Sequence, residues 1–558
     1  MERLAAIRAA TRRENPFAPP ARGGGWGRGR AQSGGMIPAQ ATPVEAQEPV
    51  AIPADAIAAY EDHIDVDRSE FVQIAPQVDP NTTSPGSVLT FGVDRDSAAW
   101  IDLAGSYVVS TCNIKAAGGG DYTLSEPVTT AEDFAAAMWS QMTLRLNGAV
   151  VSNDVASSMN VQADFVEKAL VRPFTWGAAS YPLVTAFYDA TPGGLANDRS
   201  HNMVGAGMGS VEHCCFTAGD ENPNVWVAGL TAGTGGFNTS SGKKNGAARF
   251  RNWLVATDAG APSFQVIYRP EGFFRQHALL PPYSGLQLDL TRANHNACIL
   301  STFDNAGVAA KYAPTLSITQ SILFLRKVWP TSMAAEKLEA TLQTAGEFRM
   351  PFRYCRATKF AIANGSTVLN QLGALSGTRP DVVVVAFIKT AALTSDYRRS
   401  PLNFHQNSGN DQCLVERIAV SVSGVRYPRD GDYTGYRYRP PAGGDNVENL
   451  YMRAYAEYAR MAREGHDGGD GPLVSFAQWS RAYQLWTFCT RPDGKPVMAG
   501  GVATDDRAVA QIDVHVAFNG GNLGANYPID MSCLVFAFTT AEVVYGADRT
   551  VQLSQRRV

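Results

Sequence analysis

One pattern occurs twice in this 558-residue chain, as Met142-Thr-Leu-Arg-Leu-Asn-Gly-Ala-Val-Val151 and as Arg417-Ile-Ala-Val-Ser-Val-Ser-Gly-Val-Arg426. In both stretches apolar and polar residues alternate up to a turn, which is Asn147-Gly148 in the first and Ser423-Gly424 in the second. Alternation predicts a strand with one buried face, and Asn-Gly supplies the positive φ angles that a tight hairpin requires. Each hairpin is followed by a polar stretch, one amphipathic helical pattern and three more strand patterns. The sequence therefore predicts a duplicated β-domain.

Each half of the chain offers about eight strand patterns, with helical patterns at residues 155–170, 332–342 and 447–463. Helices on long loops suit a jelly roll better than an immunoglobulin-like sandwich. We expect an all-β protein of two tandem eight-stranded jelly rolls, a double jelly roll. Short helices lie on its loops, and a disordered or extended arm precedes it.

Composition divides the chain into four segments. Residues 1–60 form an arm that is first basic and then rich in Pro and Ala, too poor in apolar residues to build a core. Residues 61–330 form the first jelly roll, with a Gly- and Asn-rich loop excursion at 171–262. A linker helix is predicted at 331–345. The second jelly roll takes up 346–558.

The arm carries an excess of positive charge, because residues 1–35 contain seven arginines and two glutamates in a chain of net charge −4. Arginine side chains neutralise phosphates and an indole stacks on bases, so these residues are candidate nucleic-acid contacts. They are Arg3, Arg8, Arg12, Arg13, Arg22, Trp26, Arg28 and Arg30. A solubilising tail or a protein-docking peptide is an equally open interpretation.

The stretches that come nearest to enzyme motifs lack the residue spacing or the partner residues that those motifs require. The Gly-rich stretch 236–244 has five residues rather than four between its glycines and lacks the Ser or Thr that binds magnesium. His213 beside Cys214-Cys215 has no second ligand pair nearby. We expect no catalytic residue, no metal ligand, no cofactor and no enzymatic activity. Carboxylates such as Asp94 and Asp102 leave one alternative open, a jelly-roll carbohydrate-binding protein or hydrolase.

The eight cysteines are scattered, and most lie in apolar strand-like runs. Isolated core cysteines are typical of free thiols in a reducing compartment. The longest apolar run, Val382–Ile388, is far shorter than the roughly 20 residues that span a bilayer. We expect a protein that is made inside a cell.

Six stretches in the order of the chain carry a family resemblance: Trp139–Asn153, Phe274–Arg292, Ser321–Val328, Ser400–Phe404, Leu450–Tyr455 and Glu542–Val551. Together they resemble the double jelly-roll major capsid proteins of the adintovirus, Polinton/Maverick and polinton-like virus group. The resemblance covers about residues 85–555 and rests on the colinear order of the stretches. The 171–262 excursion and the arginine arm depart from the family pattern.

The resemblance implies a structural protein of the virion capsid, assembled inside the host cell. In that family three chains form a pseudo-hexagonal capsomer, and capsomers tile an icosahedral shell around double-stranded DNA. The implied partners are two further copies, neighbouring capsomers, and penton and minor capsid proteins. The arm would touch genomic DNA or an internal membrane. A domesticated host copy of a capsid gene is a further alternative.

Overall fold

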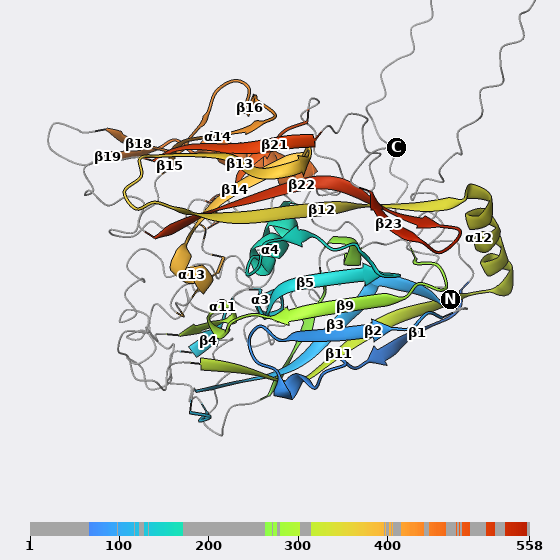
Figure 1. The fold of residues 1–558 in the computed structure, drawn as a ribbon. Coiled ribbons are helices and arrows are strands. Elements are labelled where there is room, and N and C mark those ends of the chain that lie inside the picture. Colours follow the sequence, from blue (N-terminus) through green and yellow to red (C-terminus); the bar gives the residue numbers. More distant parts are fainter. Residues whose placement is uncertain are drawn as a thin grey trace, which may run out of the picture. The chain divides into compact units, whose positions relative to one another are not determined.

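The computed structural model describes residues 66–554 with internal gaps, the larger of which are 122–127, 171–262, 302–313, 405–414, 440–445, 465–475, 492–508 and 519–529. Within the described residues, strands predominate over short helices (Figure 1). No helix of the described part is long and apolar enough to cross a membrane.

The first half folds into two antiparallel four-stranded sheets. One has the strand order β1-β11-β3-β8 and the other β2-β9-β5-β6. The strands are β1 (Val66–Ile74), β2 (Val88–Val93), β3 (Trp100–Ala116), β5 (Trp139–Leu146), β6 (Ala149–Val150), β8 (Phe264–Tyr268), β9 (Leu286–Arg292) and β11 (Pro314–Pro330).

The second half repeats this arrangement with the orders β12-β22-β14-β20 and β13-β21-β15-β16. These strands are β12 (Glu347–Ile362), β13 (Val368–Thr378), β14 (Val382–Lys389), β15 (Val415–Val422), β16 (Val425–Tyr427), β20 (Trp486–Cys489), β21 (Val509–Phe518) and β22 (Met531–Gly546). If each set is numbered one to eight along the chain, both halves have the sheets 1-8-3-6 and 2-7-4-5. This is jelly-roll topology, so the predicted double jelly roll is confirmed.

The Asn147-Gly148 and Ser423-Gly424 hairpins occupy the same place in each roll, between the fourth and fifth strands. Asn147 and Gly148 have φ angles of 47° and 92°, and Ser423 and Gly424 have 49° and 79°. Two consecutive positive φ angles define the turn that matches the right-handed twist of the flanking strands. The first residue of each turn donates its backbone N–H to the segment at the start of the seventh strand, at Gly285 and at Gln511.

Helices recur at matching places as well. Each roll has a short helix after its third strand, α3 (Phe134–Ala137) or α13 (Thr390–Thr394), and a longer one after its fifth, α4 (Asn160–Leu170) or α14 (Met452–Glu464). The linker helix α12 spans Ser332–Ala345 between the rolls. The predicted domain boundaries at residues 60, 330 and 345 stay predictions.

The two longer helices begin later than the sequence predicts. Residues before them are extended and form β7 (Asp154–Val155) and β19 (Asn446–Asn449). Sheet pairing accounts for this difference, since β7 pairs with β12 and β19 with β18. The remaining elements are η1 (Pro80–Thr82), β4 (Val128–Thr130), η4 (Gly272–Arg275), α11 (His295–Cys298), β10 (Ile299–Ser301), β17 (Tyr433–Thr434), β18 (Tyr436–Arg439) and β23 (Val551–Ser554).

Buried hydrophobic residues of both rolls form one continuous cluster. It includes four buried free thiols, Cys112, Cys298, Cys355 and Cys533. Burial raises the pKa of Cys298 to about 12, so this thiol stays protonated and unreactive at neutral pH.

Candidate functional site

Of the candidate enzymatic residues, Asp102 is engaged in structural contacts, Asp94 is exposed, and the others lie outside the described residues. Asp102 accepts from Arg326 at 2.8 Å and from the backbone N–H of Gly105 at 2.8 Å. No cluster of three His, Cys, Asp or Glu side chains in the described part could hold a metal ion. The Gly-rich stretch 236–244, His213 and its neighbouring cysteines lie outside the described residues, as do all eight arm residues, Arg3 through Arg30.

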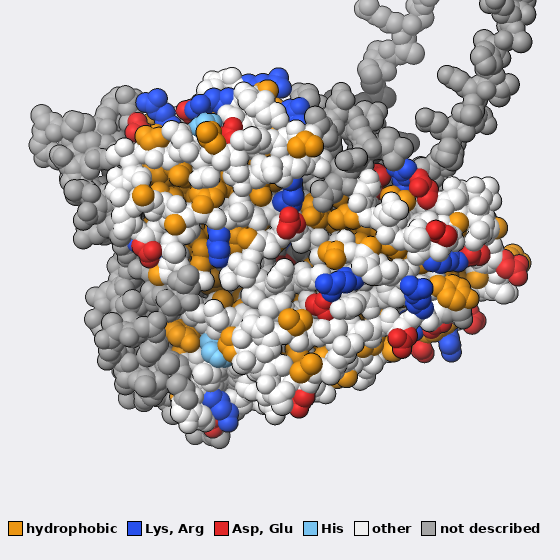
Figure 2. Space-filling view, viewed as in Figure 1, with side chains coloured by type: hydrophobic (Ala, Val, Ile, Leu, Met, Phe, Trp, Pro, Cys, Tyr) orange, Lys and Arg blue, Asp and Glu red, His pale blue; other side chains and the backbone are white. Residues whose placement is uncertain are grey.

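A small cavity lies between the rolls, lined by Trp139 and Gln162 on one side and by Leu393 and Pro401 on the other. Its volume of about 20 Å³ has room for one water molecule and no substrate. The surface is also mixed in charge: on the face drawn in Figure 2, acidic and basic side chains are interspersed over both rolls. Basic side chains are most frequent at its upper margin, around β16, where acidic side chains lie among them.

The most developed feature of the described chain is the junction between the rolls. Strand β7 leaves the first roll and pairs in parallel with β12 of the second, with Asp154 opposite Arg356 and Val155 opposite Ala357. The N–H of Ala156 then donates to the Ala357 carbonyl at 3.0 Å. One sheet of the second roll therefore contains a strand of the first.

The Asn147 turn is a second connection. Its Oδ1 accepts from the Gly285 N–H at 2.7 Å, and its Nδ2 donates to the Arg549 carbonyl of the second roll at 2.9 Å. The Tyr545 hydroxyl lies close by and accepts from Ser284 at 3.1 Å. A turn residue selected for positive φ thus also holds the second roll.

Helix α4 packs against the second roll through an aromatic side chain and through its backbone. The Phe165 ring lies 4.9 Å from that of Tyr483 and 5.8 Å from that of Phe404. The Tyr458 hydroxyl of α14 donates to the Ala169 carbonyl at 3.2 Å. The corresponding helices of the two rolls are therefore in direct contact.

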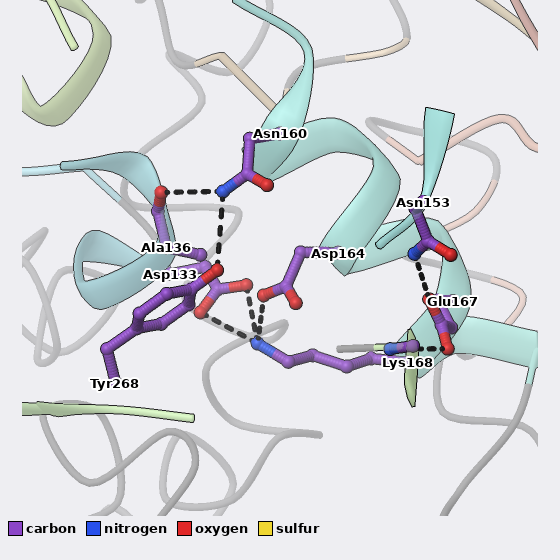
Figure 3. Close-up of polar contacts among 9 residues, drawn as sticks. Asp133, Ala136, Asn153, Asn160, Asp164, Glu167, Lys168 and Tyr268 are labelled. Atoms are coloured by element: carbon purple, nitrogen blue, oxygen red, sulfur yellow. Dashed lines mark hydrogen bonds and ion pairs between the residues drawn. The ribbon is translucent and has the colours of Figure 1, made fainter. Parts of the chain in front are cut away.

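A buried charge cluster fixes α4 to the first roll (Figure 3). Lys168 Nζ donates to Asp133 at 2.7 and 2.9 Å and to Asp164 at 2.7 Å, and all three side chains are buried. Burial raises the pKa of Asp133 from 3.8 to about 7, although Lys168 acts to lower it. Two carboxylates for one ammonium leave a surplus negative charge, which protonation removes.

The same end of α4 also meets β12, through the Asn153 amide and the Glu167 carboxylate drawn in Figure 3. Asn153 Nδ2 donates to Glu167 at 3.3 Å, and Asn153 Oδ1 accepts from the Cys355 N–H of the second roll at 3.0 Å. Glu167 accepts in addition from the Gly272 N–H. This arrangement positions backbone and offers no free nucleophile, so its role is to hold two domains in one orientation.

Comparison with known proteins adds the following. No family model and no curated protein matches the sequence. The chain is structurally similar to viral capsid proteins. A cryo-EM structure of the Sputnik virophage matches at 10% identity over 88% of this chain and 89% of that one, with a TM-score of 0.49. The mavirus major capsid protein matches at 13% identity over 92% and 96%, with a TM-score of 0.42. A quasi-atomic model of the PBCV-1 virus capsid matches at 9% over 88% and 97%, with a TM-score of 0.46.

The charge cluster predicts a specific pH dependence. Because the folded-state pKa of Asp133 lies above its unfolded value of 3.8, the stability it contributes is greatest below pH 4 and is lost as the pH rises through about 7. Asp133→Asn keeps an acceptor for Lys168 and suits the positive φ of 47°. In urea unfolding, we expect this variant to match the wild type near pH 4 and to exceed it by a growing margin up to pH 8. A stability difference that is the same at both pH values would contradict the shift in the pKa of Asp133.

Lys168→Met leaves both carboxylates buried and unpaired, so it should lower the free energy of unfolding by about 3–5 kcal/mol at pH 8.

The contacts between the rolls predict that substitutions at Asn147 and at Ser423 lower the stability by unequal amounts. Asn147→Ala removes the hydrogen bonds to Gly285 and Arg549, and we expect it to lower the free energy of unfolding by about 2–3 kcal/mol. Ser423→Ala is the matched control, because the Ser423 side chain has no hydrogen-bond partner among the described residues. Ser423 already bears the backbone cost of a positive φ, whereas Asn adopts it readily, so about 1 kcal/mol of the loss at Asn147 is a backbone effect and only the excess reports the side-chain contacts. Equal losses in chemical unfolding would show that the side-chain contacts of Asn147 do not hold the rolls together.

Proposed function

We propose that this chain is the major capsid protein of a double-stranded DNA virus. Three copies form a pseudo-hexagonal capsomer, and capsomers tile an icosahedral shell. The observation that carries the proposal is the repetition of one jelly-roll topology in two rolls that are joined by a shared sheet. Because each subunit has two similar rolls in a fixed orientation, a trimer has six similar sides, which suits hexagonal packing.

The proposal includes partners and location. Neighbouring capsomers, a penton protein at the five-fold vertices and minor capsid proteins would contact the capsomer in the virion. The colinear sequence stretches favour the adintovirus, Polinton/Maverick and polinton-like virus group. Asp102 does not favour the alternative of a carbohydrate-binding protein or hydrolase, because Arg326 and Gly105 already donate hydrogen bonds to its carboxylate.

The arm is proposed to face the shell interior and to contact DNA. On the face drawn in Figure 2 the described residues present no surface of a single charge, so the seven arginines of residues 1–35 are the strongest concentration of positive charge that the sequence offers. A protein-docking role for the arm is the competing proposal, and the arginine experiment below separates the two.

The assembly state tests the proposed function first. Size-exclusion chromatography with light scattering on the full chain should give about 179 kDa, three times the chain mass of 59.8 kDa. The mass should not change on dilution to micromolar concentration, because an obligate interface is large and apolar. A stable monomer under the same conditions would contradict the proposal.

DNA contact by the arm is tested on the trimer with fluorescence anisotropy of a short duplex. Replacing the seven arginines by glutamine should abolish binding, and replacing them by lysine should retain it, because counterion release depends on charge. Wild-type affinity should also fall steeply between about 50 and 200 mM salt. Unchanged DNA binding by the glutamine variant would contradict a DNA-binding arm and leave the docking role.

A further inference from the structure

One sheet of the first roll presents an aromatic face to solvent. Phe71 on β1 is 49% exposed, and its ring lies 5.6 Å from that of Tyr107 on β3. Tyr107 stacks on Phe324 of β11 at 5.3 Å, and both of these rings are half-buried. We call these three residues the Phe71 face. Such an apolar row across adjacent strands is typical of an interaction surface.

The corresponding sheet of the second roll has no such open face. All eight residues of β14 are buried, as are nine consecutive residues of β22, Met531–Thr539. Since successive strand residues point to opposite faces, both faces of this sheet are covered. The first roll supplies part of the cover, because its α4, β7 and η4 contact β12. For example, the Phe273 ring of η4 packs edge-on against Phe352 at 5.1 Å.

A second exposed apolar surface lies on the counterpart of α4. Met452, the first residue of α14, is 58% exposed, and the neighbouring Leu450 is also exposed. Phe476 is exposed too, and its ring packs against Tyr455 of α14 at 5.1 Å. We call Leu450, Met452 and Phe476 the α14 surface. It lies at the start of α14, the helix of the second roll that corresponds to α4, and α4 is one of the elements of the first roll that contact β12.

We propose that the Phe71 face of one copy binds the α14 surface of a second copy of this chain. The contact would repeat between chains the contact that α4 already makes within the chain. The two surfaces are different, so the interface is heterologous, and such interfaces close into rings when the rotation permits. Closure at three copies rests on the proposed function, whereas the pairing of the two surfaces rests on the repeated topology.

Light scattering on single variants of the full chain tests the pairing. Phe71→Arg and Met452→Arg each place a charge in the contact and should each shift the mass from about 179 kDa to the 59.8 kDa of one chain. Two matched controls carry the same substitutions on exposed apolar residues elsewhere. Val368→Arg lies on the edge strand β13 at a 54% exposed position, and Met333→Arg lies on α12 at an 80% exposed position. Both controls should stay trimeric.

An equimolar mixture of Phe71→Arg and Met452→Arg shows whether the interface is heterologous. Each variant keeps the surface that the other has lost, so one intact contact can form, and the mixture should reach about 120 kDa, the mass of two chains, and stop there. Circular dichroism and the melting temperature confirm that both variants are folded.

The outcomes separate this inference from the proposed function. Trimeric Phe71→Arg or Met452→Arg would overturn the pairing while the capsomer stands. A mixture that stays monomeric at a concentration where the wild type is trimeric would also overturn it, and would point to another occupant such as the chain's own N-terminal segment. A monomeric wild type would count against the proposed function itself.

Discussion

The pairing of β7 with β12 is the constraint on which the rest of the structure depends. Two residues of the first roll add a parallel strand to a sheet of the second, and a one-residue slip would turn every side chain to the other face. Around this pairing, Asn147 holds Arg549 and α4 packs against Tyr483. A rotation of one roll against the other would break these contacts together, so the contacts oppose such a rotation.

A fixed orientation of the two rolls is what makes a duplicated domain useful in a subunit. The rolls share strand order, hairpin position and the positions of two helices, yet they differ in what covers them. The sheet containing β14 is buried on both faces, whereas the sheet containing β1 leaves Phe71 exposed. This difference suits a subunit that repeats in an assembly, because the uncovered sheet of one chain can receive from the next chain the contact that the covered sheet receives within its own chain.

Local signals in the sequence predicted much of this fold. The Asn147-Gly148 and Ser423-Gly424 turns follow from backbone sterics alone, and the linker helix begins at Ser332, directly after Pro330-Thr331. The junction could not be predicted in the same way. Strand β7 has only two residues and no periodicity, and its pairing with Arg356 spans about two hundred residues of sequence. The Asp133–Lys168 ion pair joins a loop to a helix that only the tertiary fold brings together. The exposure of Phe71 could not be predicted from the sequence either, because alternation along β1 does not say which face of the strand has a partner.

The central claim is that two similar rolls per chain form six similar sides in a trimer. Electron microscopy of the purified full chain tests it most directly through class averages viewed along the symmetry axis. Six peripheral densities, alternating in two kinds around a three-fold axis, are predicted. Averages with separate single chains, or with a two-fold arrangement of the rolls, would contradict it.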